Sequence, residues 1–329
     1  MVNEDVGNFF VGCDRFAWWA KHYMFAHPEE SGVVDPITIH KSENLPLEMR
    51  RDIPHRMCDA LRGWKCENNS APNTNLPKII WLLWFDGWEA LKNEIIVGVR
   101  ASWEFYNPGW RVVLIDNLTI PSFVDIPYLW RADIFLPAKS DIVRLSLLAK
   151  YGGVWADASM LCLAPLDDWL PQAARPGGYF GYHQGPNDSQ NPGPCSWYLV
   201  AEHGSLIAQM WKNRTDKFWT EPYDPDYQAA KGHWENYSYF WMDTQFKMLR
   251  RSVPDFREQW AKVPYITCFT EFGPASYGTH KDLTLAQLET AYRNNTPNVI
   301  KLTTHGVDDE ARLMVRLATE ARRGKKVAL

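Results

Sequence analysis

The feature that most constrains the fold is a strand–helix–strand pattern near residue 100. Residues 78–85 form a continuous apolar run, which is typical of a strand buried on both faces. From Glu89 to Tyr106 apolar residues recur at helical spacing, and Asn107-Pro108-Gly109 ends that predicted helix. Residues 110–115 then predict a second strand. Such a βαβ unit implies a parallel sheet covered by helices, so we expect an α/β fold.

A second unit brings a carboxylate to a strand end. Residues 139–151 predict a helix that Gly152-Gly153 ends, and residues 154–156 predict a short strand that leads into Asp157. Ligands of open parallel sheets bind beyond the carboxyl ends of the strands. Asp157 is therefore well placed to hold Mn²⁺ or Mg²⁺, which prefer oxygen ligands. The alternative is that Asp157 only caps the strand or forms a turn.

Asp141 and Arg144 lie three residues apart in the predicted helix and share one of its faces. A carboxylate and a guanidinium at the edge of the core can bind sugar hydroxyls, and the guanidinium can also face a diphosphate. Taken alone, the pair is better explained as a local ion pair of small energetic value.

Weaker patterns predict the remaining elements. We expect strands at residues 177–182 and 299–303, helices at 206–219 and 239–251, and a long loop at 185–196. Residues 1–75 show no clean period, and we expect a helical N-terminal lobe packed on a main domain formed by residues 76–329.

Composition excludes several classes of protein. The 35 Lys and Arg residues against 39 Asp and Glu residues give a net charge of −4, without the basic excess of a nucleic-acid-binding protein. No apolar run is long enough to span a membrane, and residues 1–5 do not resemble the start of a secretory signal. The six cysteines form no CxxC pair. We therefore expect reduced thiols in a cytoplasmic protein.

The chain contains 17 tryptophans, an unusual number. Indole rings stack on the C–H faces of sugars, but they also anchor cores. Our candidates for contact with a ligand are Trp84, Trp88, Trp197 and Trp241, although packing in the core is the more common role of each one taken separately.

Several motifs occur together in one order along the chain. They are Pro77-Lys78-Ile79-Ile80-Trp81, Asn107-Pro108-Gly109-Trp110, Lys139-Ser140-Asp141 with Arg144, Tyr151-Gly152-Gly153-Val154-Trp155, Asp157-Ala158-Ser159 and Pro165-Leu166-Asp167-Asp168-Trp169. In these motifs, over roughly residues 77–305, the chain resembles the capsular polysaccharide synthesis proteins, which are related to glycosyltransferases with a DXD sugar-binding region.

This resemblance implies a GT-A fold, in which a Rossmann-like, mostly parallel sheet is flanked by helices. Residues 76–185 would bind a nucleotide-sugar donor, in this family mostly a UDP-sugar, and residues 186–329 would bind a glycan acceptor. The residues implied at the donor are Trp84, Phe85, Asp141, Arg144, Asp157, Ala158 and Ser159. Those implied at a divalent metal are Asp157, Ser159 and His305. Ser159 departs from the motif, because its neutral hydroxyl is a weaker ligand than a carboxylate, so metal dependence stays open.

Acceptor chemistry is the least specified part. Asp243, on a predicted helix among aromatic residues, is the candidate base that would take the acceptor proton, with a helix-surface or helix-start acid as the equally weighted alternative. His183, Trp197 and Trp241 are candidate acceptor contacts.

Two other functions compete with a glycosyltransferase. A carbohydrate-binding protein without catalytic activity is suggested by the many tryptophans and by Ser159. A dinucleotide-dependent oxidoreductase is suggested by the βαβ units, but Asp86-Gly87-Trp88 follows the first strand where a G-x-G-x-x-G motif would be required.

Overall fold

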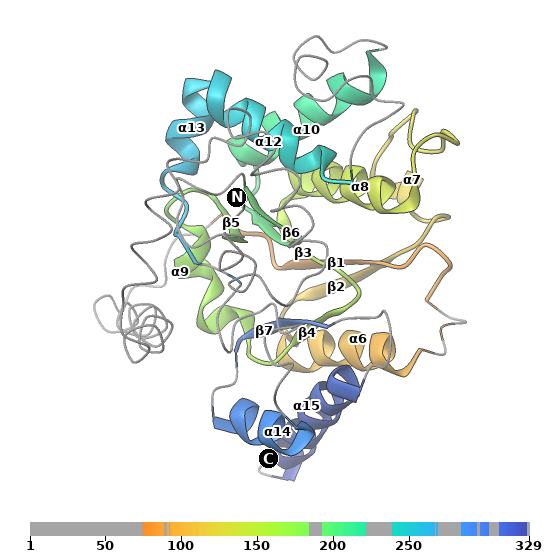
Figure 1. Cartoon of the computed structure of the whole chain (residues 1–329), viewed down its shortest axis with the longest axis vertical. Helices are drawn as coiled ribbons and strands as arrows, with labels where there is room; N and C mark the ends of the chain where they lie inside the picture. Colours follow the sequence, from red (N-terminus) through yellow and green to blue (C-terminus); the bar gives the residue numbers. More distant parts are fainter. Residues whose placement is uncertain are drawn as a thin grey trace, which may run out of the picture.

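The computed structural model describes residues 75–88, 91, 93–183, 193–221, 239–266, 268, 284–294, 297–302 and 309–327. Figure 1 shows a central sheet with helices on both sides. The predicted N-terminal lobe, apart from its last residue, lies outside the described residues, as does His305.

The described elements include the predicted strands and helices of the main domain, together with strands β4 and β6 and further helices that the sequence analysis did not predict. The strands are β1 (Ile79–Leu83), β2 (Arg111–Ile115), β3 (Gly153–Ala156), β4 (Met160–Cys162), β5 (Tyr179–His183), β6 (Pro194–Ala201) and β7 (Val299–Lys301). The helices are α6 (Glu94–Tyr106), α7 (Ile120–Phe123), α8 (Leu136–Tyr151), η3 (Leu166–Asp168), α9 (Leu170–Ala174), α10 (Leu206–Thr220), α12 (Trp241–Ser252), α13 (Pro254–Trp260), α14 (Leu285–Asn294) and α15 (Asp309–Val327).

The central sheet has the strand order β2-β1-β3-β6-β5. β1 pairs in parallel with β2 and β3, while β6 runs antiparallel to both β3 and β5. Four of the five strands therefore point the same way, which confirms the predicted mostly parallel sheet flanked by helices. A second small sheet pairs β4 with β7 in antiparallel register. β5 and β6, on either side of the expected division at residue 185, are neighbours in one sheet.

Both faces of the central sheet are covered, which explains the continuous apolar run of β1. Ile80 and Leu82 contribute to the hydrophobic cluster that also contains α6, β4 and β7 residues. The intervening Trp81 and Leu83 contribute to the cluster with α8, α10 and α12. Alternate side chains of a strand point to opposite faces, so every residue of this strand must be apolar.

The tryptophans of the described residues mostly serve the core. The indole N–H of Trp81 donates to the Gly152 carbonyl at 2.9 Å, that of Trp88 to the Ile115 carbonyl at 2.9 Å, and that of Trp103 to the Met160 carbonyl at 2.6 Å. Each indole thus fills apolar volume while its single polar atom is satisfied by the backbone of another element. The high tryptophan content is therefore not in itself a sign of carbohydrate binding.

Three cysteines lie in the described part of the chain: Cys162, Cys195 and Cys268, all buried free thiols. The Sγ atoms of Cys195 and Cys268 are 3.0 Å apart. The reduced state of these thiols stays a prediction.

Several predicted boundaries differ from those in the structure, and two of the differences have a clear physical reason. Helix α6 begins at Glu94 rather than Glu89, because the Asn93 side chain accepts hydrogen bonds from the N–H groups of Ile95 and Ile96 and caps the helix there. Strand β6 begins at Pro194, inside the predicted loop 185–196. Proline is tolerated at the first position of a strand, so its presence did not end the strand that follows.

Gly152 and Gly153 join α8 to β3 and bring the strand into the sheet. Both have left-handed backbone angles, with φ of 71° and 91°. The Gly152 N–H donates to the Leu148 carbonyl and closes the helix. A Cβ at Gly153 would lie only 2.7 Å from the Ile79 carbonyl oxygen of β1, so this residue also permits a close backbone approach.

Replacing Gly153 with alanine is expected to lower the free energy of unfolding by roughly 3 kcal/mol, because backbone strain and a steric clash add together. Gly87→Ala is the matched control: Gly87 has φ of 89° but nothing within 4 Å of the added Cβ. It should cost about 1 kcal/mol from backbone strain alone. Denaturant unfolding of both variants measures the difference, and equal losses would contradict the predicted clash.

Candidate active site

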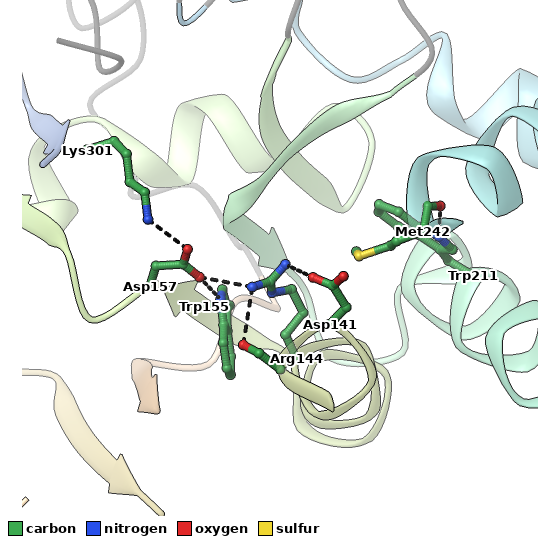
Figure 2. Close-up of polar contacts among 8 residues, drawn as sticks. Asp141, Arg144, Trp155, Asp157, Trp211, Met242 and Lys301 are labelled. Atoms are coloured by element: carbon green, nitrogen blue, oxygen red, sulfur yellow. Dashed lines mark hydrogen bonds and ion pairs between the residues drawn. The ribbon is translucent and has the colours of Figure 1, made fainter. Parts of the chain in front are cut away.

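Asp157 follows β3 at the carboxyl end of the strand, as predicted. Its Oδ1 accepts hydrogen bonds from Arg144 Nη2 at 2.9 Å and from the indole N–H of Trp155 at 3.0 Å. Its Oδ2 accepts from Lys301 Nζ at 2.8 Å. Figure 2 shows the carboxylate between Arg144 on one side and Lys301 on the other. Both oxygens of the central carboxylate are therefore engaged with cationic groups.

Arg144 joins the two acidic residues that the sequence singled out. Its side chain is 4% exposed, and it pairs with both Asp141 and Asp157. The guanidinium also lies 5.0 Å from the centre of the Trp155 ring. The predicted pair on α8 is thus more than a local surface ion pair, because it extends to the end of β3 (Figure 2).

Lys301 is a site residue that the sequence analysis missed. It belongs to β7, where it lies opposite Met160 of β4, and its Nζ donates to Ser159 Oγ at 2.6 Å as well as to Asp157. The backbone continues this contact, because Leu302 N–H donates to the Ser159 carbonyl at 2.8 Å. The only available signal was one lysine at the end of a short apolar strand, which ordinarily indicates a solvent-facing position.

The charges in this cluster shift two carboxyl groups in opposite directions. Burial raises the pKa of Asp141 to about 7. The positive charge of Arg144 lowers this pKa, while the negative charges of Asp243 and Asp157 raise it further. Burial alone would also raise the pKa of Asp157, but Lys301 and Arg144 outweigh it and hold that pKa below its ordinary value. Asp157 is therefore the ionised member of the cluster, while Asp141 changes charge near neutral pH.

The titration of Asp141 predicts a pH dependence of stability. The folded protein keeps this proton up to about pH 7, while the unfolded chain loses it near pH 4, so stability falls as pH rises between these values. Relative to Asp141→Asn, the wild type should lose roughly 2 kcal/mol of unfolding free energy between pH 5 and pH 7. Asp157 titrates below this window. Urea unfolding of both proteins at each pH tests this, and parallel curves would contradict it.

Trp84 and Phe85 lie just beyond the carboxyl end of β1, and both are partly buried. β1 and β3 are adjacent and parallel, with Trp81 opposite Trp155, so these residues share a sheet edge with Asp157. Ala158 and Ser159 follow Asp157 and are buried. The predicted donor residues thus gather at one edge of the sheet, and their contact with a donor stays a prediction.

Asp243 lies in the first turn of α12 and is buried. Its charge acts on Asp141, which places it at the same cluster. Trp211 of α10 donates to the Met242 carbonyl at 3.3 Å and so attaches the start of α12 beside Asp141 (Figure 2). Asp243 is therefore a buried acid at the start of its helix rather than a helix-surface acid, and its role as a base stays a prediction.

The candidate acceptor residues are packed inside the protein. Trp241 is fully buried, and its ring stacks on Phe218 at 5.4 Å. His183 is 1% exposed, with its ring 4.4 Å from that of Tyr265. Trp197 is 8% exposed, and its carbonyl accepts the Asp157 N–H at 2.9 Å. The structure gives all three a packing role, and contact with an acceptor stays a prediction for each.

The described residues do not provide a set of ligands suited to a divalent metal. They contain no group of three or more His, Cys, Asp or Glu side chains that could hold one. Of the implied ligands, Asp157 and Ser159 already bind the Lys301 ammonium, and His305 lies outside the described residues. The arrangement instead presents fixed cations at a strand end.

The fold and the charged cluster define an α/β protein with a candidate ligand site at the carboxyl edge of its sheet. The sequence profile of the family described as capsular polysaccharide synthesis protein matches residues 48–272, more than half of the chain. The chain therefore belongs to this family, whose name indicates a role in polysaccharide biosynthesis.

Individual relatives are more distant. A presumed glycosyltransferase, HOC1 of Saccharomyces cerevisiae, is 25% identical over 112 residues, which are 32% of this chain and 28% of the yeast protein. The chain thus matches less than a third of that relative's length. Among solved structures, PaToxG glycosyltransferase aligns over 75% of this chain and 95% of its own, with 14% identity and a TM-score of 0.32.

A glycosyltransferase involved in the glycosylation of the major capsid of PBCV-1 aligns over 73% of this chain and all of its own, with 9% identity and a TM-score of 0.38. At these scores neither alignment assigns a residue or a substrate. Across the part of the chain that the structure describes, no helix is both long enough and apolar enough to cross a membrane.

Proposed function

We propose that the chain is a glycosyltransferase that moves a sugar from a nucleotide-sugar donor, expected to be a UDP-sugar, to a glycan acceptor. The observation that carries the proposal is the cluster of Asp157, Arg144 and Lys301 at the carboxyl edge of a mostly parallel sheet. Membership in a polysaccharide synthesis family supports it. A diphosphate is the part of such a donor that needs fixed positive charge at this edge.

The proposed reaction assigns a role to each group. The acceptor hydroxyl oxygen bonds to the anomeric carbon while the bond between that carbon and the diphosphate breaks, and the nucleoside diphosphate leaves with its negative charge. Arg144 and Lys301 offset that charge, because cations fixed in a partly buried site need no rearrangement as charge develops. Asp243 is the candidate to receive the acceptor proton if the configuration inverts.

A divalent metal bound by Asp157, Ser159 and His305 stays a prediction from the family resemblance. No step above depends on it, since the Lys301 ammonium occupies the described oxygens of that set.

Incubation of the protein with a panel of UDP- and GDP-sugars tests the proposal. Released nucleoside diphosphate is measured, both with Mn²⁺ and with a chelator. We expect release from one donor, because transferases often hydrolyse their donor slowly without an acceptor. Thermal shift with the same donors is the companion measurement. Donor binding without release, even after glycan acceptors are added, would favour the catalytically inactive carbohydrate-binding protein. The proposal is refuted if no donor binds and no donor releases its nucleoside diphosphate.

A further inference from the structure

We infer that Lys301 takes the place of a divalent cation at the donor diphosphate, so that donor binding needs no metal. The inference rests on the proposed function, since it concerns the same site. It begins from the contacts of one ammonium group: Lys301 Nζ is 2.8 Å from Asp157 Oδ2 and 2.6 Å from Ser159 Oγ. These two side chains are the first and third of the segment Asp157-Ala158-Ser159, which corresponds to the acidic DXD motif of the family. Both were expected to be metal ligands.

The geometry leaves little room for a metal between these oxygens. The Lys301 ammonium already contacts both oxygens that would bind a metal at this position, Asp157 Oδ2 and Ser159 Oγ. The other carboxylate oxygen, Oδ1, already accepts from Arg144 at 2.9 Å and from Trp155 at 3.0 Å. A metal would have to displace Lys301 before it could use this pair.

The departure from the acidic motif fits this arrangement. A carboxylate at position 159 would add a second negative charge and favour a doubly charged ion. Ser159 instead supplies a neutral oxygen, and one carboxylate with one hydroxyl suits a single positive charge. Two cations, Arg144 and Lys301, contact Asp157, and Arg144 is shared with Asp141.

The Lys301 side chain is partly exposed, and its backbone is held in position. The side chains of Lys301 and Asp157 are 17% and 26% exposed, so the pair reaches the surface at the sheet edge. The register of β7 on β4 and the bond from Leu302 N–H to the Ser159 carbonyl fix the backbone that carries Lys301. A cation held this way is preorganised for phosphate oxygens, as a bound metal would be.

The test measures binding of UDP by calorimetry, with a chelator and with Mn²⁺, together with binding of Mn²⁺ alone by paramagnetic resonance. The wild type should bind UDP with the same affinity in both conditions. Any Mn²⁺ that binds to the wild type should bind equally well to Asp157→Asn. Lys301→Ala should weaken UDP binding about 10- to 100-fold in chelator, the range expected for one charged hydrogen bond. Because this variant frees Asp157 and Ser159, Mn²⁺ should recover part of the loss.

Two variants serve as controls. Lys301→Arg keeps the charge and should retain metal-independent binding within a few-fold. Lys262→Ala removes an exposed lysine that contacts Glu258 and Gln259, and it should leave UDP affinity unchanged. Thermal unfolding of each variant shows whether the fold is kept.

The inference is overturned if chelator abolishes UDP binding to the wild type and Mn²⁺ restores it. It is also overturned if Lys301→Ala, still folded, binds UDP as the wild type does in chelator. If no nucleotide binds under any condition, the proposed glycosyltransferase function is refuted, independently of the result for Lys301. The Mn²⁺ titration then still decides about Lys301, because Asp157-dependent Mn²⁺ binding by the wild type would overturn the inference and its absence would support it.

Discussion

Replacing Asp157 with asparagine is expected to lower the rate of donor turnover by about 100-fold or more, a typical loss when one preorganised charged group is removed from an active site. Asp157 is the shared partner of Arg144, Trp155 and Lys301. An asparagine keeps the shape but loses the charge, and its amide N–H₂ would face a cation. The two cations would then be held less firmly at the position proposed for the diphosphate.

A close control for this substitution lies elsewhere in the same chain. Asp167 also accepts from a lysine, Lys78 at 2.8 Å, and from an indole, Trp110 at 3.0 Å, but it belongs to η3 and half of its side chain is exposed. Asp167→Asn should leave turnover within about twofold, because surface ion pairs contribute little. The measurement is nucleoside diphosphate release at saturating donor. Turnover by Asp157→Asn within a few-fold of wild type would refute the assignment of this site.

Arg144→Ala is expected to have the largest effect on stability, about 3–5 kcal/mol, the loss typical when one partner of a buried ion pair is removed. Arg144 is 3% exposed, and its removal leaves Asp141 and Asp157 without the guanidinium that bridges them. The melting temperature should fall by roughly 10 °C. Arg144→Lys should have an intermediate effect, because an ammonium keeps the charge but lacks the planar fork.

Calorimetric or denaturant unfolding measures this effect. Arg100→Ala is the control, since Arg100 forms an exposed pair with Glu104 on α6, and its loss should be below about 1 kcal/mol. Combining Arg144→Ala with Asp141→Asn should destabilise less than the sum of the two changes, because the second removes a carboxylate that the first left uncompensated. Strict additivity would contradict the proposed coupling.

The elements that sequence predicted well are those with strong local signals. The apolar run from Ile79 to Leu83 predicts a strand buried on both faces, and both faces are covered in the structure. Gly152-Gly153 predicts a helix end, and the backbone there has positive φ. β6 was not predicted, because its signal, five consecutive apolar residues from Trp197, follows a stretch rich in proline and glycine. Local composition outweighed the strand pattern there.

The candidate site was predicted in part for a similar reason. Asp157, Asp141 and Arg144 are close in sequence and carry a recognisable spacing, and the structure brings them together. Lys301 could not be predicted, since its position depends on the pairing of β7 with β4 across a long stretch of chain. His305 was expected from the same late strand, but the described residue that reaches Asp157 is Lys301.

The distance along the chain between Asp157 and Lys301, 144 residues, has a consequence for how the protein is made. At typical rates of synthesis the ribosome needs roughly 7 to 30 s to reach Lys301 after it has added Asp157. During that interval the nascent chain carries the acidic motif without its lysine, and β4 without its partner strand. The site proposed for the donor can acquire its charge balance only after Lys301 has been added, so a nascent chain that stops short of Lys301 should have little affinity for the donor.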